Sequence, residues 1–82
     1  MYFVYVLRSL KDNKNYTGST ENVAKRLKEH NAGKTESTRR RRPFELVYQE
    51  EFNTREEAEA REKYLKSGKG REELKLILDT DE

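Results

Sequence analysis

The strongest restriction on the fold comes from residues 2–7, which read Tyr-Phe-Val-Tyr-Val-Leu. β-Branched and aromatic side chains favour extended backbone, and here they occupy both faces of the predicted strand. A strand that is apolar on both faces is buried on both sides. The chain has 82 residues, which is room for one domain with a small core. We therefore expect this strand to lie inside a single layered unit.

The next elements follow from turn and capping residues. Residues 16–18 predict a second strand, which runs antiparallel to the first across a polar turn. Ser19 or Thr20 is then predicted to cap a helix, with Glu21 in its first turn and Gly33 just past its end.

The second half of the chain predicts one strand and two helices. Residues 44–52 alternate in part between apolar and polar side chains, as a strand does. Residues 54–57 read Thr-Arg-Glu-Glu, a capping box for a helix that runs to about Lys66. Residues 67–70 are predicted to break this helix, and a short amphipathic helix follows with its apolar residues at positions 74–78.

The predicted order is β-β-α-β-α-α, an α+β fold in which helices pack on a small sheet. We expect residues 1–82 to form a single domain, with residues 79–82 as a frayed acidic tail. The chain has no cysteine and one histidine, which excludes disulfides, thiolate nucleophiles and multi-histidine zinc sites. No apolar run approaches the roughly 20 residues of a membrane span, and no signal peptide is evident. We expect a cytoplasmic monomer with no membrane contact.

Charge is distributed unevenly along the chain. Residues 1–43 hold 11 Lys and Arg against 4 Asp and Glu, a balance of +7, whereas residues 44–82 hold 7 against 12, a balance of −5. The first half is therefore suited to a polyanion such as nucleic acid, and the second half is not. A solvated charged surface explains the same counts equally well.

Two polar residues border the apolar stripe of the first predicted helix. With about 3.6 residues per turn, Arg26 and His30 lie one turn apart, beside the stripe that Val23 and Leu27 form. Arginine is rarely buried without a partner. One interpretation is structural, with the stem of Arg26 lying on the sheet and His30 bonded to a backbone carbonyl. The other interpretation is that both belong to a functional site.

A carboxylate intrudes in the same way on the second predicted helix. Glu62 lies between Ala58 and Leu65 on the face predicted to point to the core. Burying an ionised carboxylate costs several kcal/mol unless a cation, a metal or hydrogen-bond donors meet it. Glu62 is therefore either paired with a nearby arginine or lysine, such as Arg26 or Arg61, or a ligand for a hard divalent cation.

Tyr5 in the first strand and Tyr16 in the second add two phenols, although buried tyrosines usually serve packing. Together with Arg26, His30 and Glu62, they are the parts of a site for metal-assisted phosphodiester hydrolysis. The carboxylate would hold one Mg²⁺ or Mn²⁺, the arginine would neutralise charge on the phosphoryl oxygens, and a tyrosine would take a proton from water. Such a site requires residues far apart in the sequence to converge on one wet pocket, where the carboxylate and the tyrosine hydroxyls surround a hard cation.

These residues carry a resemblance to the GIY-YIG nuclease domain, specifically to its small single-domain branch. The first motif of the family resembles Phe3-Val4-Tyr5, which lacks the leading glycine. The second motif resembles Tyr16-Thr17-Gly18, with Thr in place of Ile. Three further segments resemble, in turn, the stretch from the second motif to the catalytic helix, the metal-binding helix and the third strand: residues 16–31, 60–66 and 43–48.

The resemblance covers about residues 2–78 and implies a three-stranded antiparallel sheet flanked by helices. It also implies an endonuclease that hydrolyses phosphodiester bonds in DNA with one Mg²⁺ or Mn²⁺, and a role in DNA repair or recombination. Some members of the family carry an asparagine after the metal-binding helix, whereas residues 69–72 of this chain contain none.

The resemblance also implies a role for each residue of the predicted site. Tyr16 or Tyr5 would be the general base or would position the water, and the choice between them stays open. Arg26 would contact the scissile phosphate, His30 would assist proton transfer or orient the phosphate, and Glu62 would bind the single metal ion.

Contacts to nucleic acid are expected from the basic residues that follow the second strand, because no separate DNA-binding domain is expected. These residues are Lys25, Lys28, Lys34, Arg39, Arg40, Arg41 and Arg42. Such contacts go to phosphate and carry little sequence information, and they make affinity fall steeply with salt. A mobile, solvated loop is the plain interpretation of the arginine run. Two other functions stay open: a module that holds nucleic acid without cutting it, and a nuclease subunit that needs a protein partner.

Overall fold

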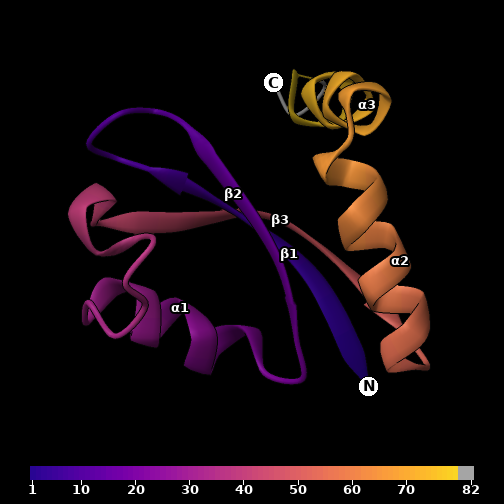
Figure 1. Cartoon of the computed structure of the whole chain (residues 1–82), viewed down its shortest axis with the longest axis horizontal. Coiled ribbons are helices and arrows are strands. Elements are labelled where there is room, and N and C mark those ends of the chain that lie inside the picture. The colour runs from indigo at the N-terminus through magenta and orange to yellow at the C-terminus, as the bar shows by residue number, and fades with distance from the viewer. Residues whose placement is uncertain (80–82) are drawn as a thin grey trace.

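The computed structural model describes residues 1–79, in which a three-stranded sheet carries three α-helices (Figure 1). The strand order is β2-β1-β3, and both pairs of neighbours are antiparallel. The predicted α+β class, the three-stranded antiparallel sheet and the order β-β-α-β-α-α are therefore confirmed. The elements are β1 (Tyr2–Ser9), β2 (Asn15–Thr20), α1 (Val23–Asn31), the 3-10 helix η1 (Arg39–Arg41), β3 (Phe44–Phe52), α2 (Arg55–Lys66) and α3 (Gly68–Asp79).

β1 is the central strand, as its apolar sequence predicts. Val4, Tyr5, Val6 and Leu7 are each at most 1% exposed to solvent. Successive side chains of a strand point to opposite faces. The even-numbered residues of β1 accordingly pack toward α2 and α3, and the odd-numbered residues pack toward α1.

The face beneath α2 and α3 is an apolar core. Val4 and Val6 pack there against Ala58, Leu65 and Leu74, and all five are at most 5% exposed. Figure 1 shows α2 beside the sheet. α3 lies above α2 in this view and is seen nearly along its axis. Burying a leucine side chain fully contributes about 1.5–3 kcal/mol, so this cluster supplies a substantial part of the stability of so small a domain.

The face toward α1 contains polar groups as well as apolar ones. Its apolar cluster combines two aromatic rings with two aliphatic side chains, namely Tyr5, Phe44, Leu7 and Val23. Ser9, His30 and Thr38 are fully buried around this cluster. All three form hydrogen bonds, which buried polar groups require.

The first helix begins later than the sequence predicts. Asn22, not Ser19 or Thr20, is the N-cap of α1, and its side chain accepts a hydrogen bond from the backbone N–H three residues later at 3.0 Å. Ser19 and Thr20 instead extend β2, because both are paired with β1. Glu21 consequently lies before the helix rather than in its first turn. The helix ends before Gly33, as predicted.

α2 and α3 are separated by one residue where the sequence predicts a four-residue break. That residue, Ser67, serves both helices. Its hydroxyl donates to the Tyr64 carbonyl at 2.6 Å and accepts from the Gly70 backbone N–H at 3.2 Å. Gly70 suits this corner because a Cβ there would collide with the Tyr64 carbonyl oxygen.

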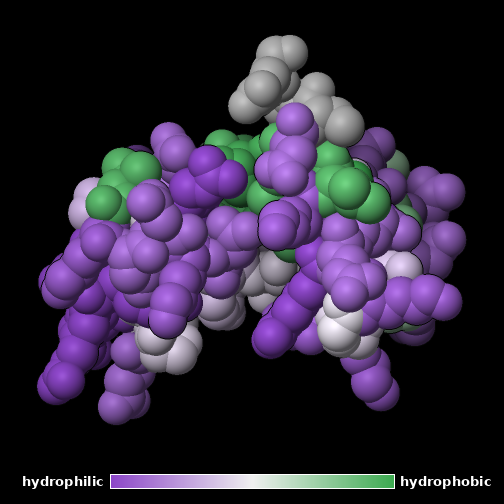
Figure 2. All heavy atoms as spheres, turned by 90° about the horizontal axis from the view of Figure 1, so that it is seen from above, coloured by the Kyte–Doolittle hydropathy of each residue, from purple (hydrophilic) through white to green (hydrophobic). Residues whose placement is uncertain are grey.

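α3 is therefore longer than the short helix expected, and Asp79 is its last residue rather than part of a tail. The expected frayed segment at residues 80–82 lies outside the described residues. Within residues 1–79, no helix is long and apolar enough to cross a membrane. Figure 2 shows a surface that is mostly hydrophilic, with hydrophobic side chains in a few places.

Candidate active site

Tyr5 lies in the middle of β1, and its side chain reaches toward the edge strand β2. The residue opposite Tyr5 on β2 is Gly18. A Cβ on Gly18 would lie 2.6 Å from the Tyr5 hydroxyl oxygen, which is closer than unbonded atoms approach. The glycine of the second motif therefore gives the Tyr5 ring the space to reach the edge of the sheet.

The Tyr5 hydroxyl is held by a buried chain of hydrogen bonds. It lies 3.1 Å from His30 Nε2, and the other ring nitrogen, Nδ1, lies 2.8 Å from Thr38 Oγ1. The Thr38 hydroxyl donates its single proton to the Thr35 carbonyl at 3.4 Å. A neutral imidazole has one N–H, so one ring nitrogen of His30 donates and the other accepts. His30 thus joins the hydroxyls of Tyr5 and Thr38 in one chain.

The protonation states agree with this chain. Burial lowers the pKa of His30, and the nearby positive charge of Arg26 lowers it further. Burial raises the pKa of Tyr5, while an interaction with the Arg26 guanidinium opposes that rise. A neutral His30 and a protonated Tyr5 are therefore the stable forms at neutral pH.

Arg26 projects from α1 toward the Tyr5 hydroxyl. Its side chain is 32% exposed, and its Nη1 atom lies 2.9 Å from Glu29 Oε1 one turn later. The Tyr5 hydroxyl and Glu29 both raise the pKa of Arg26, while burial opposes them. Arg26 thus has one side toward the buried phenol and another toward solvent, where an anion can reach it.

Tyr16 lies on the same face of the sheet as Tyr5, near the solvent. Its ring is 4.9 Å from the His30 ring and 6.4 Å from the Tyr5 ring, measured between centroids. The Lys66 ammonium lies 5.9 Å from the centre of the Tyr16 ring. Among the described residues, no hydrogen-bond partner is found for the Tyr16 hydroxyl. Of the two phenols, Tyr16 is the more accessible.

Glu62 is a half-buried carboxylate on α2. Its Oε1 atom accepts from the Ser19 hydroxyl at 2.6 Å, and its Oε2 atom lies 2.6 Å from Lys66 Nζ one turn later. Neither arginine considered above as a partner is paired with it. Arg26 binds Glu29, and Arg61 binds carboxylates from β3 and α3.

The predicted site residues meet at the edge of the sheet, but from opposite faces. Tyr5, Arg26 and His30 lie on the α1 face, whereas Glu62 lies on the α2 face. They approach each other around β2, which has no strand beyond it. The Glu62 charge raises the pKa of Tyr5, although no hydrogen bond joins Glu62 to either tyrosine within residues 1–79. The two sets of side chains therefore surround one strand, β2. We call this group the band, and its members are Tyr5, Tyr16, Arg26, His30 and Glu62.

The expectation of a single wet pocket is wrong for two of the five residues. Tyr5 is 1% exposed and His30 is fully buried. The aromatic cluster and the α1 helix exclude solvent from both. Only Arg26, Tyr16 and Glu62 present part of their side chains to solvent at the band, so a substrate would meet these three residues first.

The basic segment after α1 is folded rather than loose. Arg41 donates to Asp12 at 3.1 Å, Arg39 to the Gly33 carbonyl at 3.0 Å, and Arg42 to the Arg39 carbonyl at 2.8 Å. Among the described residues, no side-chain hydrogen bond or ion pair is found for Arg40. Three lysines on and after α1 are exposed: Lys25, Lys28 and Lys34.

Sequence reasoning missed three groups at the site. Thr38 carries no local motif, and its role becomes visible only when η1 places it against His30. Ser19 has the sequence of a helix cap, which concealed its contact with Glu62. Lys66 could have been found, because a lysine four residues after a glutamate on a helix faces it.

Comparison with known proteins identifies the class to which this chain belongs. The sequence model of the GIY-YIG catalytic domain matches residues 1–75. The chain belongs to the GIY-YIG family, a family of nucleases. This match confirms the family that the two tyrosine motifs indicated.

Relatives cover the same length of chain. A UPF0213 protein of Staphylococcus haemolyticus is 46% identical over 77 residues, which is 93% of each chain. A UPF0213 protein of Clostridium perfringens is 45% identical over 78 residues, covering 94% of this chain and 83% of the relative. The solution structure of a UPF0213 protein from Bacillus halodurans is 40% identical, with a TM-score of 0.56, and the match covers 94% of this chain and 85% of that one.

Proposed function

We propose that this protein is a divalent-metal-dependent endonuclease that hydrolyses phosphodiester bonds in DNA at the edge of β2. The observation that carries the proposal is the band of side chains around this strand. Arg26 and Tyr16 approach it from the α1 face, and Glu62 approaches it from the α2 face. Binding phosphate alone would require no carboxylate there, because a carboxylate repels phosphate unless a cation lies between them.

The residues at the band fit a single hard cation. Mg²⁺ keeps several waters and is commonly held by one or two carboxylates together with substrate phosphates. Glu62 supplies one such carboxylate, and the Ser19 hydroxyl orients it at 2.6 Å. No group of three or more potential His, Asp or Glu ligands occurs within residues 1–79, so water and substrate would complete the coordination. Mg²⁺ or Mn²⁺ bound at Glu62 would polarise the phosphate and stabilise negative charge on the leaving oxygen.

Arg26 would bind the phosphate that is attacked. Its guanidinium keeps its charge at any pH at which the protein is folded, and it offers a planar set of donors that suits a phosphoryl group. Its partner Glu29 is replaceable, because the pair is partly exposed and such pairs contribute little. Phosphate oxygens can therefore take the outward side of Arg26 while its other side stays on Tyr5.

The two tyrosines would have different roles. Tyr16 is accessible and would orient the attacking water or accept its proton. Tyr5 is buried, and its hydroxyl is fixed by His30, so Tyr5 would position the Arg26 guanidinium. A phenol loses its proton readily only where cations surround it. Arg26 and the bound cation would supply that positive charge.

A cleavage assay tests the proposal. Duplex, single-stranded, flap and junction DNA are incubated with the protein in Mg²⁺ or Mn²⁺, with a chelator as a blank. Glu62→Ala and Tyr16→Phe are compared with wild type. Removing a group that stabilises the transition state lowers the rate by about 10²–10³-fold. We expect losses of this size for Glu62→Ala and smaller losses for Tyr16→Phe.

Glu59→Ala is the matched control, because Glu59 is an exposed glutamate on the same helix and the change in charge is identical. The Glu59→Ala variant should cleave DNA at the wild-type rate. Cutting that persists in Glu62→Ala would point to a contaminating nuclease or to another site, and would refute the proposal.

One contact favours the alternative of a binding module. Lys66 Nζ lies 2.6 Å from Glu62 Oε2 and already neutralises the carboxylate that a metal would use. In a module, this pair would be permanent, and DNA would bind without being cut. Lys66→Gln separates the two functions. A nuclease should bind Mn²⁺ at least as tightly after the change, whereas a module should bind no metal in either form. A subunit that needs a partner would bind Mn²⁺ but cut only when the partner is present.

A further inference from the structure

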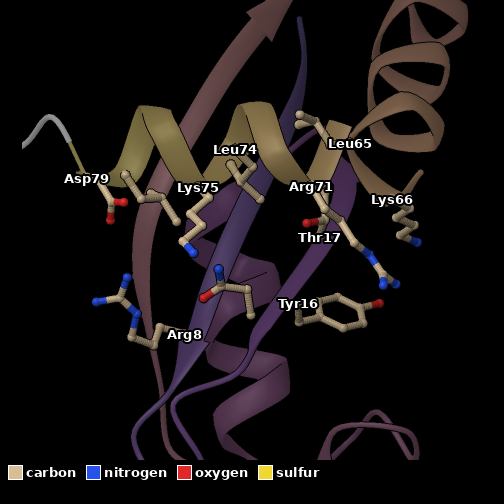
Figure 3. Close-up of a pocket in the computed structure, with 11 residues that line it drawn as sticks. Arg8, Tyr16, Thr17, Leu65, Lys66, Arg71, Leu74, Lys75 and Asp79 are labelled. Carbon is tan, nitrogen blue, oxygen red and sulfur yellow. The ribbon is translucent and has the colours of Figure 1, made fainter. Parts of the chain in front are cut away.

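A second basic region lies beside the band, in a cleft between the β1–β2 edge and the two C-terminal helices. Its volume is about 550 Å³, within the range of roughly 300–1,000 Å³ that is typical of ligand pockets. Figure 3 shows α3 along one side of the cleft, with Lys66 and Arg71 near Tyr16 and with Arg8 toward the other end. Neither Arg8 nor the residues of α3 belong to the site described above.

Positive charge dominates this cleft. Four cationic side chains line it, namely Arg8, Lys66, Arg71 and Lys75, against one carboxylate, Asp79. Lys66 is paired with Glu62. Among the described residues, no ion pair or side-chain hydrogen bond engages the other three cations. Three unpaired cations around a concavity create a strongly attractive potential for an anion.

The inner wall of the cleft is apolar. Leu65 and Leu74 lie at the floor of the cleft but are at most 5% exposed, so its accessible apolar surface is that of Leu78 and the Tyr16 ring. A duplex presents its phosphates outward and keeps its bases stacked and paired. An unpaired strand can offer both a phosphate and the face of a base to a surface that is cationic at the rim and apolar within.

The position of the cleft along β2 connects it to the proposed site. Asn15, Tyr16 and Thr17 of β2 line the cleft. Gly18 and Ser19, which contact Tyr5 and Glu62, follow immediately along the same strand. The cleft and the Glu62 contact are thus adjacent along β2. A nucleic-acid strand bound across Glu62 would continue directly into the cleft.

We propose that the cleft binds the unpaired strand that flanks the scissile phosphate, with phosphates on Arg71 and Lys75 and a base against Leu78 and the Tyr16 ring. The proposal rests on the proposed function for the position of the scissile phosphate, but the binding itself does not require cleavage. The protein would accordingly prefer single-stranded, flap or frayed DNA over a fully paired duplex.

Binding measured without metal tests the proposal. Fluorescence anisotropy is recorded in a chelator with a labelled single strand of 12 nucleotides, the same strand in a duplex, and the same strand with abasic sites. Arg71→Gln/Lys75→Gln should weaken single-strand binding about tenfold and reduce the salt slope by about 1.4, at about 0.7 per phosphate contact. Duplex binding should change less. Wild type should bind the abasic strand more weakly than the intact one.

Lys63→Gln/Lys69→Gln is the control, because it also removes two positive charges from exposed residues, one on α2 and one on α3, and neither lines the cleft. Circular dichroism should show that both double variants fold. Equal losses in the two double variants, or equal losses for duplex and single strand, would overturn the proposal. If Arg71→Gln/Lys75→Gln cleaves DNA and its single-strand binding is unchanged, the proposed role of the cleft is refuted and the proposed nuclease activity is not. If single-strand binding depends on Arg71 and Lys75 but no DNA is cleaved, the role of the cleft is supported and the nuclease activity is refuted.

Discussion

Beneath α2 and α3 the sheet buries Val4, Val6 and two leucines, whereas toward α1 it buries Tyr5, His30 and Thr38. The first face is held together by the hydrophobic effect and tolerates polar groups only at its rim. The second face contains a continuous chain of hydrogen bonds within an aromatic cluster. Packing alone would be served by apolar residues on both faces. In the proposed function, the polar chain on the α1 side positions Tyr5 and Arg26, while the α2 side combines the apolar core with Glu62 at its edge.

The apolar core of the α2 face, away from Glu62 at its edge, should respond to substitution through stability. Leu65→Ala removes a side chain that is 1% exposed, and such changes cost about 2–5 kcal/mol. Urea unfolding should show this loss. Leu76→Ala, at a position 68% exposed, should stay within about 0.5 kcal/mol of wild type. Equal losses in the two variants would mean that the leucine core does not support the fold as described.

The α1 face should respond through activity. Arg26→Ala should lower the rate of DNA cleavage by about 10²–10³-fold, because the phosphate loses its arginine. Stability should fall by no more than about 1 kcal/mol, since the ion pair of Arg26 is partly exposed. Lys25→Ala, next along α1, is the control and should affect only the salt dependence of binding. Loss of stability without loss of rate would contradict the role proposed for Arg26.

Gly18→Ala should affect both properties, because Gly18 lies where Tyr5 crosses to the edge. The added Cβ would lie 2.6 Å from the Tyr5 hydroxyl, and overpacking of this kind costs about 1–3 kcal/mol. Displacing Tyr5 should also reduce cleavage. Tyr5→Phe would not relieve the contact, because the ring carbon Cζ would still lie 2.8 Å from the added Cβ. A Gly18→Ala variant as stable and as active as wild type would show that the close approach does not limit the site.

The smallest effect is expected from titration of His30. Its pKa is lowered in the fold, by burial first and then by Arg26, relative to about 6.5 in the unfolded chain. The unfolded state therefore binds more protons in this range. The contribution of His30 to stability is complete above about pH 6.5 and is lost as the pH falls below that value. Unfolding curves at pH 7.5 and 5.5 should differ less in His30→Gln than in wild type.

Much of the fold could be predicted from local patterns. The bounds of β3 and the capping box of α2 follow from alternation and from Thr54 with Glu57. The start of α1 could not be predicted in the same way, because Ser19 and Thr20 are good caps that pairing with β1 draws into β2. The corner at Ser67 was also concealed, since one serine there ends one helix and begins the next.

The parts of the site were identifiable, but their arrangement was not. The side chains of Arg26 and Glu62 stand out on their helices because polar groups intrude on apolar faces. That they lie on opposite faces of the sheet depends on strand order, which no local pattern reveals. The basic cleft was hidden for a different reason. The second half of the chain has a balance of −5, yet three of its cations, Lys66, Arg71 and Lys75, gather on one surface.

The proposed nuclease activity depends most on Glu62 holding a cation at the edge of β2, and a Mn²⁺ titration followed by NMR tests this directly. Bound Mn²⁺ broadens the signals of nearby nuclei. We predict early broadening of the backbone amide signals of Gly18 and Ser19, abolished by Glu62→Gln and unchanged by Glu59→Gln. Broadening that survives Glu62→Gln, or that appears only at other acidic residues, would contradict the central claim.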